Sequence, residues 1–295
     1  MPVRTEVLMG TFVTIDIVGE APDALNAMDR AFRWFREIEA SCSRFEDDSE
    51  LMQLCARPGM PVRVSDILFE AVRFAVAVAD DSRGAFDPTV GGRMAARGFD
   101  RHHRTGHRVG GAAVDEGASY RDVAVDDEHR TITLRRPHTL DLGAVAKGLA
   151  VDAAARELRA FADFAIDAGG DLFLGGRSPS GEPWSVGIRH PRIDRELIEV
   201  LRVSDRAVCT SGDYERTTQA TAEHHLIDPR TGTSPAAVAS VTVIAPNAML
   251  ADALATAAFV LGPGDGLALL ERHDVDGLIF TSDLQRHTTT GFPRA

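Results

Sequence analysis

Strand-like and helix-like segments are interspersed along this 295-residue chain without strict alternation. Hairpin-like pairs of strands outnumber strand–helix–strand units, which favours an α+β fold with mixed or antiparallel sheets over a doubly wound parallel sheet. The length suits one large domain or two small ones, since single hydrophobic cores stop growing at roughly 250 to 300 residues. We therefore expect one domain over residues 1–295, with two intertwined lobes as the alternative.

Apolar periodicity and capping residues predict the individual elements. Residues 7–18 are rich in β-branched residues and predict a strand, whereas apolar residues recur three and four apart over 22–38, as in an amphipathic helix. Ser65 is a candidate N-cap for a second helix that ends near residues 80–84. The other predicted elements are a hairpin over 123–134, helices over about 144–161 and 248–261, and strands over 164–167, 184–190, 197–203, 240–245 and 277–281.

Neither a zinc site nor a disulfide framework is indicated. The segment 97–118 lacks periodicity and contains several glycines, which predicts a surface loop. Its histidines do not indicate a metal site, because no acidic or cysteine partner stands at suitable spacing beside them: His102, His103 and His107. The cysteines are odd in number and widely spaced, and we expect them to be small buried hydrophobic residues: Cys42, Cys55 and Cys209.

Composition excludes several classes of function. The 44 acidic and 32 basic residues give a formal net charge of -12, which repels a phosphate backbone, so no nucleic-acid partner is expected. Hydrophobic residues make up 44% of the chain, as in soluble globular domains. No run of about 18 apolar residues predicts a transmembrane segment. The chain as written is expected to be cytoplasmic, or exported or membrane-anchored if a leader precedes it.

The segment LDLGAVAKGLAVDAAARELRA, residues 140–160, predicts a short strand that ends at Leu142 and a helix that begins after Gly143. The free N–H groups at such a helix start favour an anion. Asp141 can accept hydrogen bonds from a ligand, and Lys147 can approach the anionic part of that ligand. The alternative is a capped helix with a surface lysine.

The segment ADALATAAFVLG, residues 251–262, predicts an apolar helix with two polar side chains on one face. Asp252 and Thr256 stand four residues apart, which places them on the same side of a helix. A buried carboxylate is costly unless it is paired or bound to metal, and a hydroxyl is a second hard oxygen of the kind that Mg²⁺ accepts. The alternative is that Asp252 is only a favourable negative charge near the N-terminus of the helix and that the Thr256 hydroxyl bonds to the helix backbone.

The segment EHHLIDPRTGTSP, residues 223–235, predicts a tight turn over 228–232 that holds a preceding strand with His225 at its end. A histidine that titrates near neutrality is a candidate for taking a proton from an attacking hydroxyl, although a structural role is the alternative. Glycine-bearing turns that let backbone approach a ligand occur in GAFDPTVGG (84–92), DAGGDLFLGG (167–176) and TSGDYE (210–215).

Eight segments follow one another in a distinctive order: MGTFVTI, SRFEDDSEL, GAFDPTVGG, LDLGAVAKGLAVD, DAGGDLFLGG, TSGDYE, HHLIDPRTG and SVTVIAPNAMLADALATAAFVLG. In this order and spacing they resemble the ApbE family of FAD:protein FMN transferases. The resemblance covers Met9 to about Gly262, and the HHLIDPRTG and AD-x-L-x-T pieces are its most specific parts.

The resemblance implies a T-fold-like α+β chain with its FAD site between two halves. It implies Mg²⁺-dependent cleavage of the FAD pyrophosphate, with covalent transfer of FMN to a threonine or serine of an acceptor flavoprotein and release of AMP. His225 is the candidate base. The implied metal ligands are the Ala144 carbonyl, Asp252 and Thr256, and the implied FAD contacts are Met9, Phe45, Ala85, Phe86, Asp87, Asp141, Lys147 and Ile227.

Two positions depart from the family pattern. Phe45 stands where a tyrosine often stacks on the flavin, so stacking is retained without a phenolic hydrogen bond. Ala255 stands where some members have a further acidic ligand, which leaves the number of metal ions open. Two other functions remain as alternatives: an Mg²⁺-dependent pyrophosphatase that yields FMN and AMP, and a non-catalytic FAD-binding protein.

Overall fold

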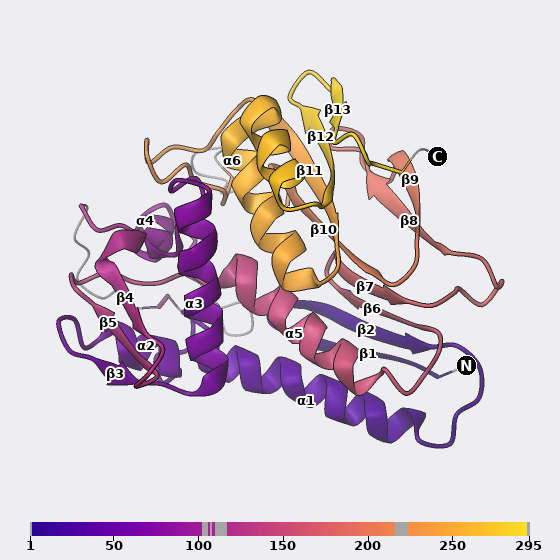
Figure 1. Cartoon of the computed structure of the whole chain (residues 1–295), viewed down its shortest axis with the longest axis horizontal. Helices are drawn as coiled ribbons and strands as arrows, with labels where there is room; N and C mark the ends of the chain where they lie inside the picture. Colours follow the sequence, from indigo (N-terminus) through magenta and orange to yellow (C-terminus); the bar gives the residue numbers. More distant parts are fainter. Residues whose placement is uncertain (1, 102–105, 107, 110–116, 216–223, 294–295) are drawn as a thin grey trace. The chain divides into compact units, whose positions relative to one another are not determined.

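The structure, a computed structural model, describes residues 2–101, 106, 108–109, 117–215 and 224–293 (Figure 1). The chain forms two compact units. Unit 1 contains Met1–Arg36, Lys147–Glu215 and Ala236–Ala295, and unit 2 contains Glu37–Ala146 and Arg216–Pro235. Each unit is thus built from segments that are distant in the sequence.

An antiparallel sheet of eight strands, in the order β1-β2-β6-β7-β10-β11-β12-β13, forms the centre of unit 1. Antiparallel pairing throughout confirms the α+β class expected from the sequence. The strands are β1 (Val3–Leu8), β2 (Thr11–Ile17), β6 (Phe164–Ala168), β7 (Asp171–Gly175), β10 (Arg206–Gly212), β11 (Val238–Ala245), β12 (Asp276–Thr281) and β13 (Arg286–Thr288).

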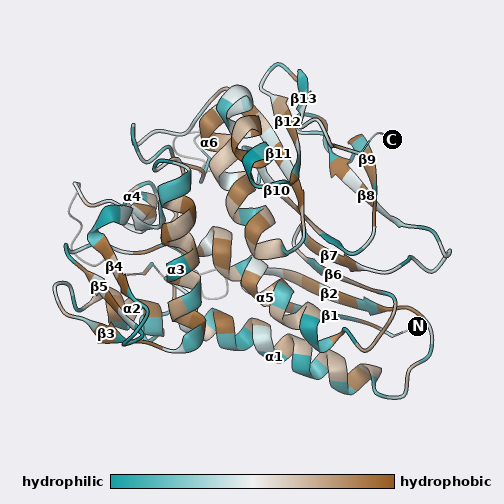
Figure 2. Ribbon diagram, viewed as in Figure 1, coloured by the Kyte–Doolittle hydropathy of each residue, from teal (hydrophilic) through white to brown (hydrophobic). Residues whose placement is uncertain are grey.

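Three helices lie wholly or partly in unit 1: α1 (Ala24–Cys42), α5 (Gly143–Glu157) and α6 (Ala248–Arg272). Helix α6 packs against β10, β11 and β12, and Figure 2 colours much of α6 and β11 as hydrophobic. Gly148 marks a close approach of α5 to α6, because a Cβ added there would lie 2.5 Å from the Met249 Cα. The indole of Trp34 on α1 donates to Glu157 on α5 at 3.1 Å.

The opposite face of the sheet packs on a hairpin formed by β8 (Trp184–Arg189) and β9 (Leu197–Val203). Alternation along each strand separates the two faces. On β10, Val208 joins the core beneath this hairpin, whereas Ser211 points to α6. The core beneath the hairpin consists of Leu174, Val186, Ile188, Leu201, Val203, Val208, Ile244, Leu278, Phe280 and Phe292.

Helix α6 is, within the described part of the chain, the one helix long and apolar enough to cross a membrane by length and composition. Of the most apolar stretch of α6, 56% is buried inside the protein. A buried core helix meets the same criterion, and the packing of α6 on three strands accounts for its apolar composition.

Unit 2 contains a small antiparallel sheet in the order β3-β5-β4 and three α-helices. The β4–β5 hairpin confirms the one expected over 123–134. The elements are α2 (Glu50–Cys55), β3 (Val62–Arg63), α3 (Asp66–Asp81), the 3₁₀-helix η1 (Pro88–Val90), α4 (Gly91–Ala96), the 3₁₀-helix η2 (Tyr120–Asp122), β4 (Val123–Asp126) and β5 (Thr131–Leu134).

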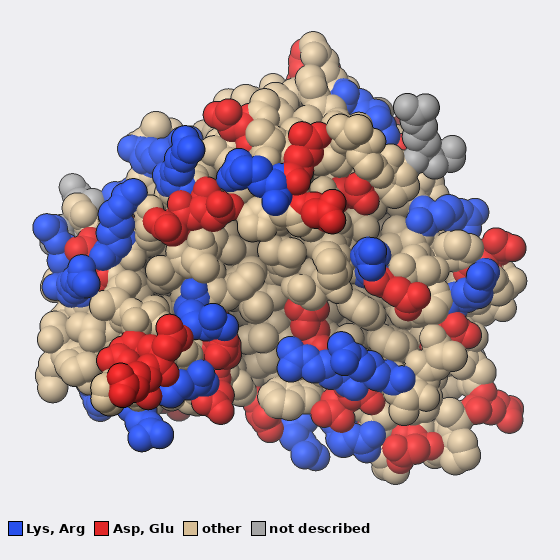
Figure 3. Space-filling view, viewed as in Figure 1, with Lys and Arg blue, Asp and Glu red and all other residues tan. Residues whose placement is uncertain are grey.

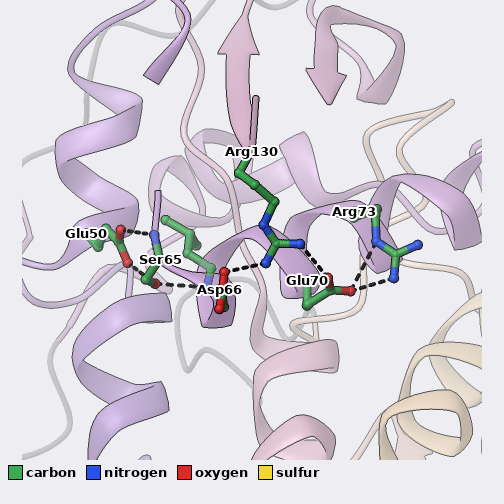
Figure 4. A network of polar contacts seen from close by, with 7 residues as sticks. Glu50, Ser65, Asp66, Glu70, Arg73 and Arg130 are labelled. Carbon is green, nitrogen blue, oxygen red and sulfur yellow. Dashed lines mark hydrogen bonds and ion pairs between the residues drawn. The ribbon is translucent and has the colours of Figure 1, made fainter. Parts of the chain in front are cut away.

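A polar network ties α2, α3 and the β4–β5 loop together (Figure 4). Ser65 caps α3 as expected, since its hydroxyl accepts from Leu68 N at 3.3 Å. The Glu50 carboxylate accepts from Ser65 N at 2.6 Å. Arg130 donates to Asp66 at 2.5 Å and to Glu70 at 3.1 Å. On the face shown in Figure 3, basic and acidic side chains both occur, with small groups of one sign among them.

Several elements differ from the sequence-based expectations. The strand expected over 7–18 is wrong: β1 and β2 form a hairpin, with Met9 and Gly10 at positive φ in a two-residue turn. The strand expected to end at Leu142 is wrong, because residues 137–142 join no sheet. No strand lies in the described residues just before 228, and α6 continues to Arg272. His102, His103 and His107 lie outside the described residues.

Candidate active site

The start of α6 in unit 1 is held by two capping side chains. Asn247 accepts from Leu250 N at 2.9 Å. Asp152 of α5 accepts from Ala248 N at 2.7 Å and from Met249 N at 3.0 Å. Since these bonds satisfy the free N–H groups of the first turn, the direction of α6 and of the side chains that follow is fixed.

Asp252 and Thr256 extend from the next turns of α6. Asp252 is only 7% exposed. The Thr256 hydroxyl lies 3.2 Å from the hydroxyl of Ser211, which projects from β10. Unit 1 thus places a buried carboxylate and an oriented hydroxyl four residues apart on one helix, as the sequence predicts.

Lys147, in the second turn of α5, forms an ion pair with Asp171 at the start of β7. Asp171 is only 2% exposed. Burial lowers the pKa of Lys147, but the carboxylates of Asp171 and Asp252 raise it more, so the pKa lies above its ordinary value of 10.5. Lys147 therefore carries a stable positive charge near Asp252, and the alternative of a surface lysine is wrong.

Met9 occupies the tip of the β1–β2 hairpin, where its φ is 50°. This tip lies beside the turn that joins β6 to β7, because a Cβ added to Gly169 would lie 2.0 Å from the Thr11 hydroxyl. A non-glycine residue in the left-handed region is uncommon and is maintained by its surroundings. The hairpin turn therefore fixes where the Met9 backbone lies.

In unit 2, the loop of Ala85, Phe86 and Asp87 is buried, with Asp87 only 8% exposed. The Asp87 carboxylate accepts from Thr89 N at 2.8 Å and from Tyr120 N at 3.1 Å. These bonds cap η1 and connect it to η2. The Asp87 carboxylate therefore stabilises the conformation of the loop.

The same loop packs beside Asp141. Asp141 N donates to Pro88 O at 2.7 Å, and a Cβ added to Gly91 would lie 2.6 Å from Thr139 O. The Asp141 carboxylate accepts from Gly143 N at 2.7 Å and from the Arg44 guanidinium at 2.6 Å. Unit 2 therefore brings the 85–87 loop and Asp141 together at the start of α5.

Arg44 is a residue that the sequence-based reasoning missed. Its side chain is 6% exposed, and its guanidinium also donates to Phe99 O at 2.6 Å. The guanidinium lies over the Phe45 ring, 4.1 Å from the ring centroid. The signal was present in the segment SRFEDDSEL, where Arg44 stands directly before Phe45.

The segment 224–235 is held by α4 and by its own turn. Arg93 donates to Pro229 O at 2.5 Å, and Arg97, one helical turn later, donates to Gly232 O. Gly232 N donates to Asp228 O at 2.7 Å, which confirms the expected tight turn. Ile227 is buried, and the His225 ring lies edge-on to Phe99 with 6.4 Å between ring centroids.

The chain matches the sequence profile of the ApbE family over residues 9–279. The chain belongs to the ApbE family. It is 34% identical to an FAD:protein FMN transferase of Treponema pallidum, and the match covers 98% of this chain and 86% of the relative.

Two solved structures have the same fold. An ApbE protein from Thermotoga maritima has a TM-score of 0.88 and 27% identity, with 100% of this ApbE chain and 99% of that chain covered. The flavin transferase ApbE from Vibrio cholerae has a TM-score of 0.85 and 26% identity, with 99% and 97% covered. The family expected from the sequence is therefore confirmed.

The predicted residues of this ApbE chain are divided between the units. Unit 1 contains Met9, Lys147, Asp252 and Thr256, and unit 2 contains Phe45, Ala85, Phe86, Asp87, Asp141, Ala144, His225 and Ile227. Their contacts reveal further residues, which are Arg44, Asp171 and Ser211. Asp171 and Ser211 lie in the glycine-bearing segments DAGGDLFLGG and TSGDYE, which could have drawn attention to them.

The donor set of unit 1 is suited to Mg²⁺. Among the described residues, no three His, Cys, Asp or Glu side chains are grouped so that they could hold a metal ion. Mg²⁺ does not require such a group, since it binds through one or two carboxylates and retains several waters. The hard oxygens of Asp252 and Thr256 therefore fit Mg²⁺ better than they fit zinc, which prefers nitrogen and sulfur ligands.

Proposed function

We propose that this chain is an FAD:protein FMN transferase that cleaves the FAD pyrophosphate and attaches FMN to a threonine or serine of an acceptor flavoprotein. The observation that carries the proposal is the group in unit 1 of a buried carboxylate with a half-buried hydroxyl and a half-buried ammonium: Asp252, Thr256 and Lys147. Such a group suits a pyrophosphate that is bound together with a divalent cation. The name of the Treponema pallidum relative supports the same reaction.

In the proposed reaction, the hydroxyl oxygen of the acceptor attacks the phosphorus on the FMN side of the pyrophosphate. A new P–O bond joins FMN to the acceptor, the P–O bond to AMP breaks, and AMP departs with the electron pair. His225 takes the proton of the attacking hydroxyl. Phe45 offers an aromatic face to the flavin, and the 85–87 loop and Asp141 orient FAD.

Asp252 and Thr256 of unit 1 would hold Mg²⁺. When bound, Mg²⁺ supplies charge stabilisation at the pyrophosphate. Lys147 adds a fixed positive charge, because its ion pair with Asp171 keeps the ammonium in place. Ser211 orients the Thr256 hydroxyl so that a lone pair is presented in one direction.

The test is incubation of the protein with FAD, MgCl₂ and candidate acceptor proteins, followed by mass spectrometry of the acceptors. We expect the mass of FMN on one threonine or serine and one AMP released for each acceptor labelled. Release of FMN and AMP without a labelled acceptor would instead identify the chain as a pyrophosphatase, and binding of FAD without AMP release would identify a non-catalytic binding protein.

Two pairs of variants test the residue roles. His225→Ala is expected to bind FAD but to transfer about 10²- to 10⁴-fold more slowly, whereas His129→Ala, in the exposed β4–β5 loop, should transfer at the normal rate. Asp252→Ala is expected to lose Mg²⁺-dependent turnover, whereas Asp265→Ala, exposed on the same helix, should retain it. Full activity of the His225 variant would remove the proposed base.

A further inference from the structure

Arg44 contacts three parts of unit 2 that the proposed function uses. Its Nε donates to Asp141 Oδ2 at 2.6 Å, and its Nη2 donates to Phe99 O at 2.6 Å. Its planar face lies over the ring of Phe45. With the side chain only 6% exposed, these contacts hold the guanidinium in one orientation.

Phe99 contacts both Arg44 and His225. The two rings meet edge to face, with 6.4 Å between centroids and an interplanar angle of 66°. The Phe99 carbonyl is bonded to Arg44, so the backbone that sets the position of the ring is fixed by the same guanidinium. A continuous set of contacts therefore runs from Asp141 through Arg44 and Phe99 to His225.

We propose that Arg44 is a positioning residue that links FAD binding at Asp141 to the orientation of the His225 imidazole. The inference rests on the proposed function, in which Asp141 contacts FAD and His225 accepts the proton. Asp141 can present its carboxylate to FAD in one direction because Arg44 and Gly143 N hold both oxygens. The His225 ring is held in one orientation because it packs on Phe99, whose carbonyl is bonded to Arg44.

The chemistry at position 44 requires an arginine. The guanidinium is a rigid fork whose separate N–H groups reach a carboxylate and a carbonyl at the same time, while its flat face covers an aromatic ring. A lysine would retain the charge beside Asp141 but would lose the second directed bond and the stacking. Arg44→Lys therefore separates the Asp141 contact from the Phe99 contact.

The experiment compares Arg44→Met and Arg44→Lys with a control, Arg73→Met, at an exposed arginine of α3 in the same unit. FAD affinity is measured by quenching of flavin fluorescence. The orientation of His225 is followed through the NMR signal of its Cε1–H group in ¹³C-histidine-labelled protein, assigned with His225→Ala. Thermal unfolding shows what fraction of each variant is folded.

We expect Arg44→Met to weaken FAD binding about 10- to 100-fold, as for loss of a hydrogen bond to a charged group, and to move the His225 signal. Arg44→Lys should recover most of the FAD affinity while the His225 signal stays displaced. Arg73→Met should match the wild-type protein in both measurements. Phe99→Leu should displace the His225 signal without weakening FAD binding.

A purely structural role for Arg44 would lower only the melting temperature. Wild-type FAD affinity and an unmoved His225 signal in the folded fraction of Arg44→Lys and Arg44→Met would overturn the proposal. So would weaker FAD binding with an unmoved His225 signal, since the link would then be absent. If Arg44→Met does not fold, Arg44→Lys and Phe99→Leu decide the question by the same criteria.

These readouts need no acceptor, so the two proposals can fail separately. Wild-type protein that binds FAD but labels no acceptor would contradict the transferase while the NMR and fluorescence results still decide the role of Arg44. Wild-type protein that labels an acceptor while Arg44→Lys retains the wild-type His225 signal would contradict only the role of Arg44.

Discussion

Single residues in this ApbE chain act through partners that stand far away in the sequence. The Thr256 hydroxyl is oriented by Ser211, and the Lys147 ammonium is held by Asp171. Each partner is buried and lies on a strand of the central sheet, whereas the residue that it orients lies on a helix. The sheet thus serves as the rigid support for the helix-borne groups.

Ser211→Ala should weaken Mg²⁺ binding about tenfold, because groups that orient a metal ligand typically contribute this much to affinity. Ser211→Thr retains the hydroxyl and should restore the affinity. The measurement is a titration with Mn²⁺, as a spectroscopic substitute for Mg²⁺, followed by electron paramagnetic resonance. Equal affinities for wild type and Ser211→Ala would show that the Ser211–Thr256 contact has no part in metal binding.

Asp171→Asn should lower the free energy of unfolding by about 3–5 kcal/mol, because it leaves the Lys147 ammonium without its buried counter-charge. The double variant Lys147→Met with Asp171→Leu should recover much of this loss, since it removes both charges together. Urea unfolding followed by circular dichroism measures both. A double variant less stable than Asp171→Asn would contradict this view of the pair.

At the scale of elements, the contact between α5 and α6 determines where Asp252 and Thr256 lie. Gly148 allows the helices to approach, and Asp152 caps α6 from the side of α5. The apolar sequence of α6 then packs on β10, β11 and β12. The cap and the packing of α6 together fix where the Asp252 and Thr256 side chains lie above the sheet.

Gly148→Ala should destabilise the protein by about 1–3 kcal/mol, as overpacking of a well-packed core does. The added Cβ would lie 2.5 Å from Met249 Cα and 2.6 Å from Ala248 O, and backbone atoms cannot turn aside as a side chain can. Thermal unfolding measures the loss. Gly264→Ala, where an added Cβ meets nothing within 4 Å, is the matched control and should change stability little.

Glu157 links α1 to α5 in a manner that depends on pH. The Trp34 indole, together with Arg30, lowers the pKa of Glu157 below its usual 4.5, although burial opposes this. A carboxyl whose pKa is lower in the folded state stabilises the protein above the unfolded-state pKa and loses this contribution as pH falls through the folded-state pKa. Glu157→Gln should therefore be less stable than wild type at about pH 7, with the difference narrowing by about pH 3.

Urea unfolding curves of wild type and Glu157→Gln at several pH values would measure this difference. A gap in stability that persists unchanged into acid would show that the contacts of Glu157 with Trp34 and Arg30 do not depend on its charge.

At the scale of the whole molecule, neither unit depends on a metal for its core. Unit 1 is held by the sheet, its helices and the hairpin core, and unit 2 by α2, α3 and the small sheet with the network of Figure 4. Because these contacts do not involve Asp252 or Thr256, we expect them to be independent of a bound ion.

Treatment with EDTA should therefore abolish FMN transfer while far-ultraviolet circular dichroism remains unchanged, and added MgCl₂ should restore transfer. The comparison of activity with circular dichroism separates loss of metal from loss of fold. Transfer that persists after EDTA treatment and exhaustive dialysis would contradict the Mg²⁺ dependence that we propose.

The sequence by itself determined the family, the α+β class and most of the regular elements. Ser65, the 123–134 hairpin and the 197–203 strand are set by local patterns of capping, alternation and turn residues, and the structure confirms them. The family motifs extend over nearly the whole chain, which made the identification possible without a structure.

Only the tertiary structure decided which side chains meet. Residues 140–142 have the composition of a strand but pair with no other strand, and positive φ at Met9 and Gly10 folds the expected strand 7–18 into a hairpin. Arg44 meets Asp141, and Lys147 meets Asp171, because the fold brings together segments 97 and 24 residues apart. Local periodicity contains no information on such contacts, since they depend on how elements pack and not on the propensity of any one segment.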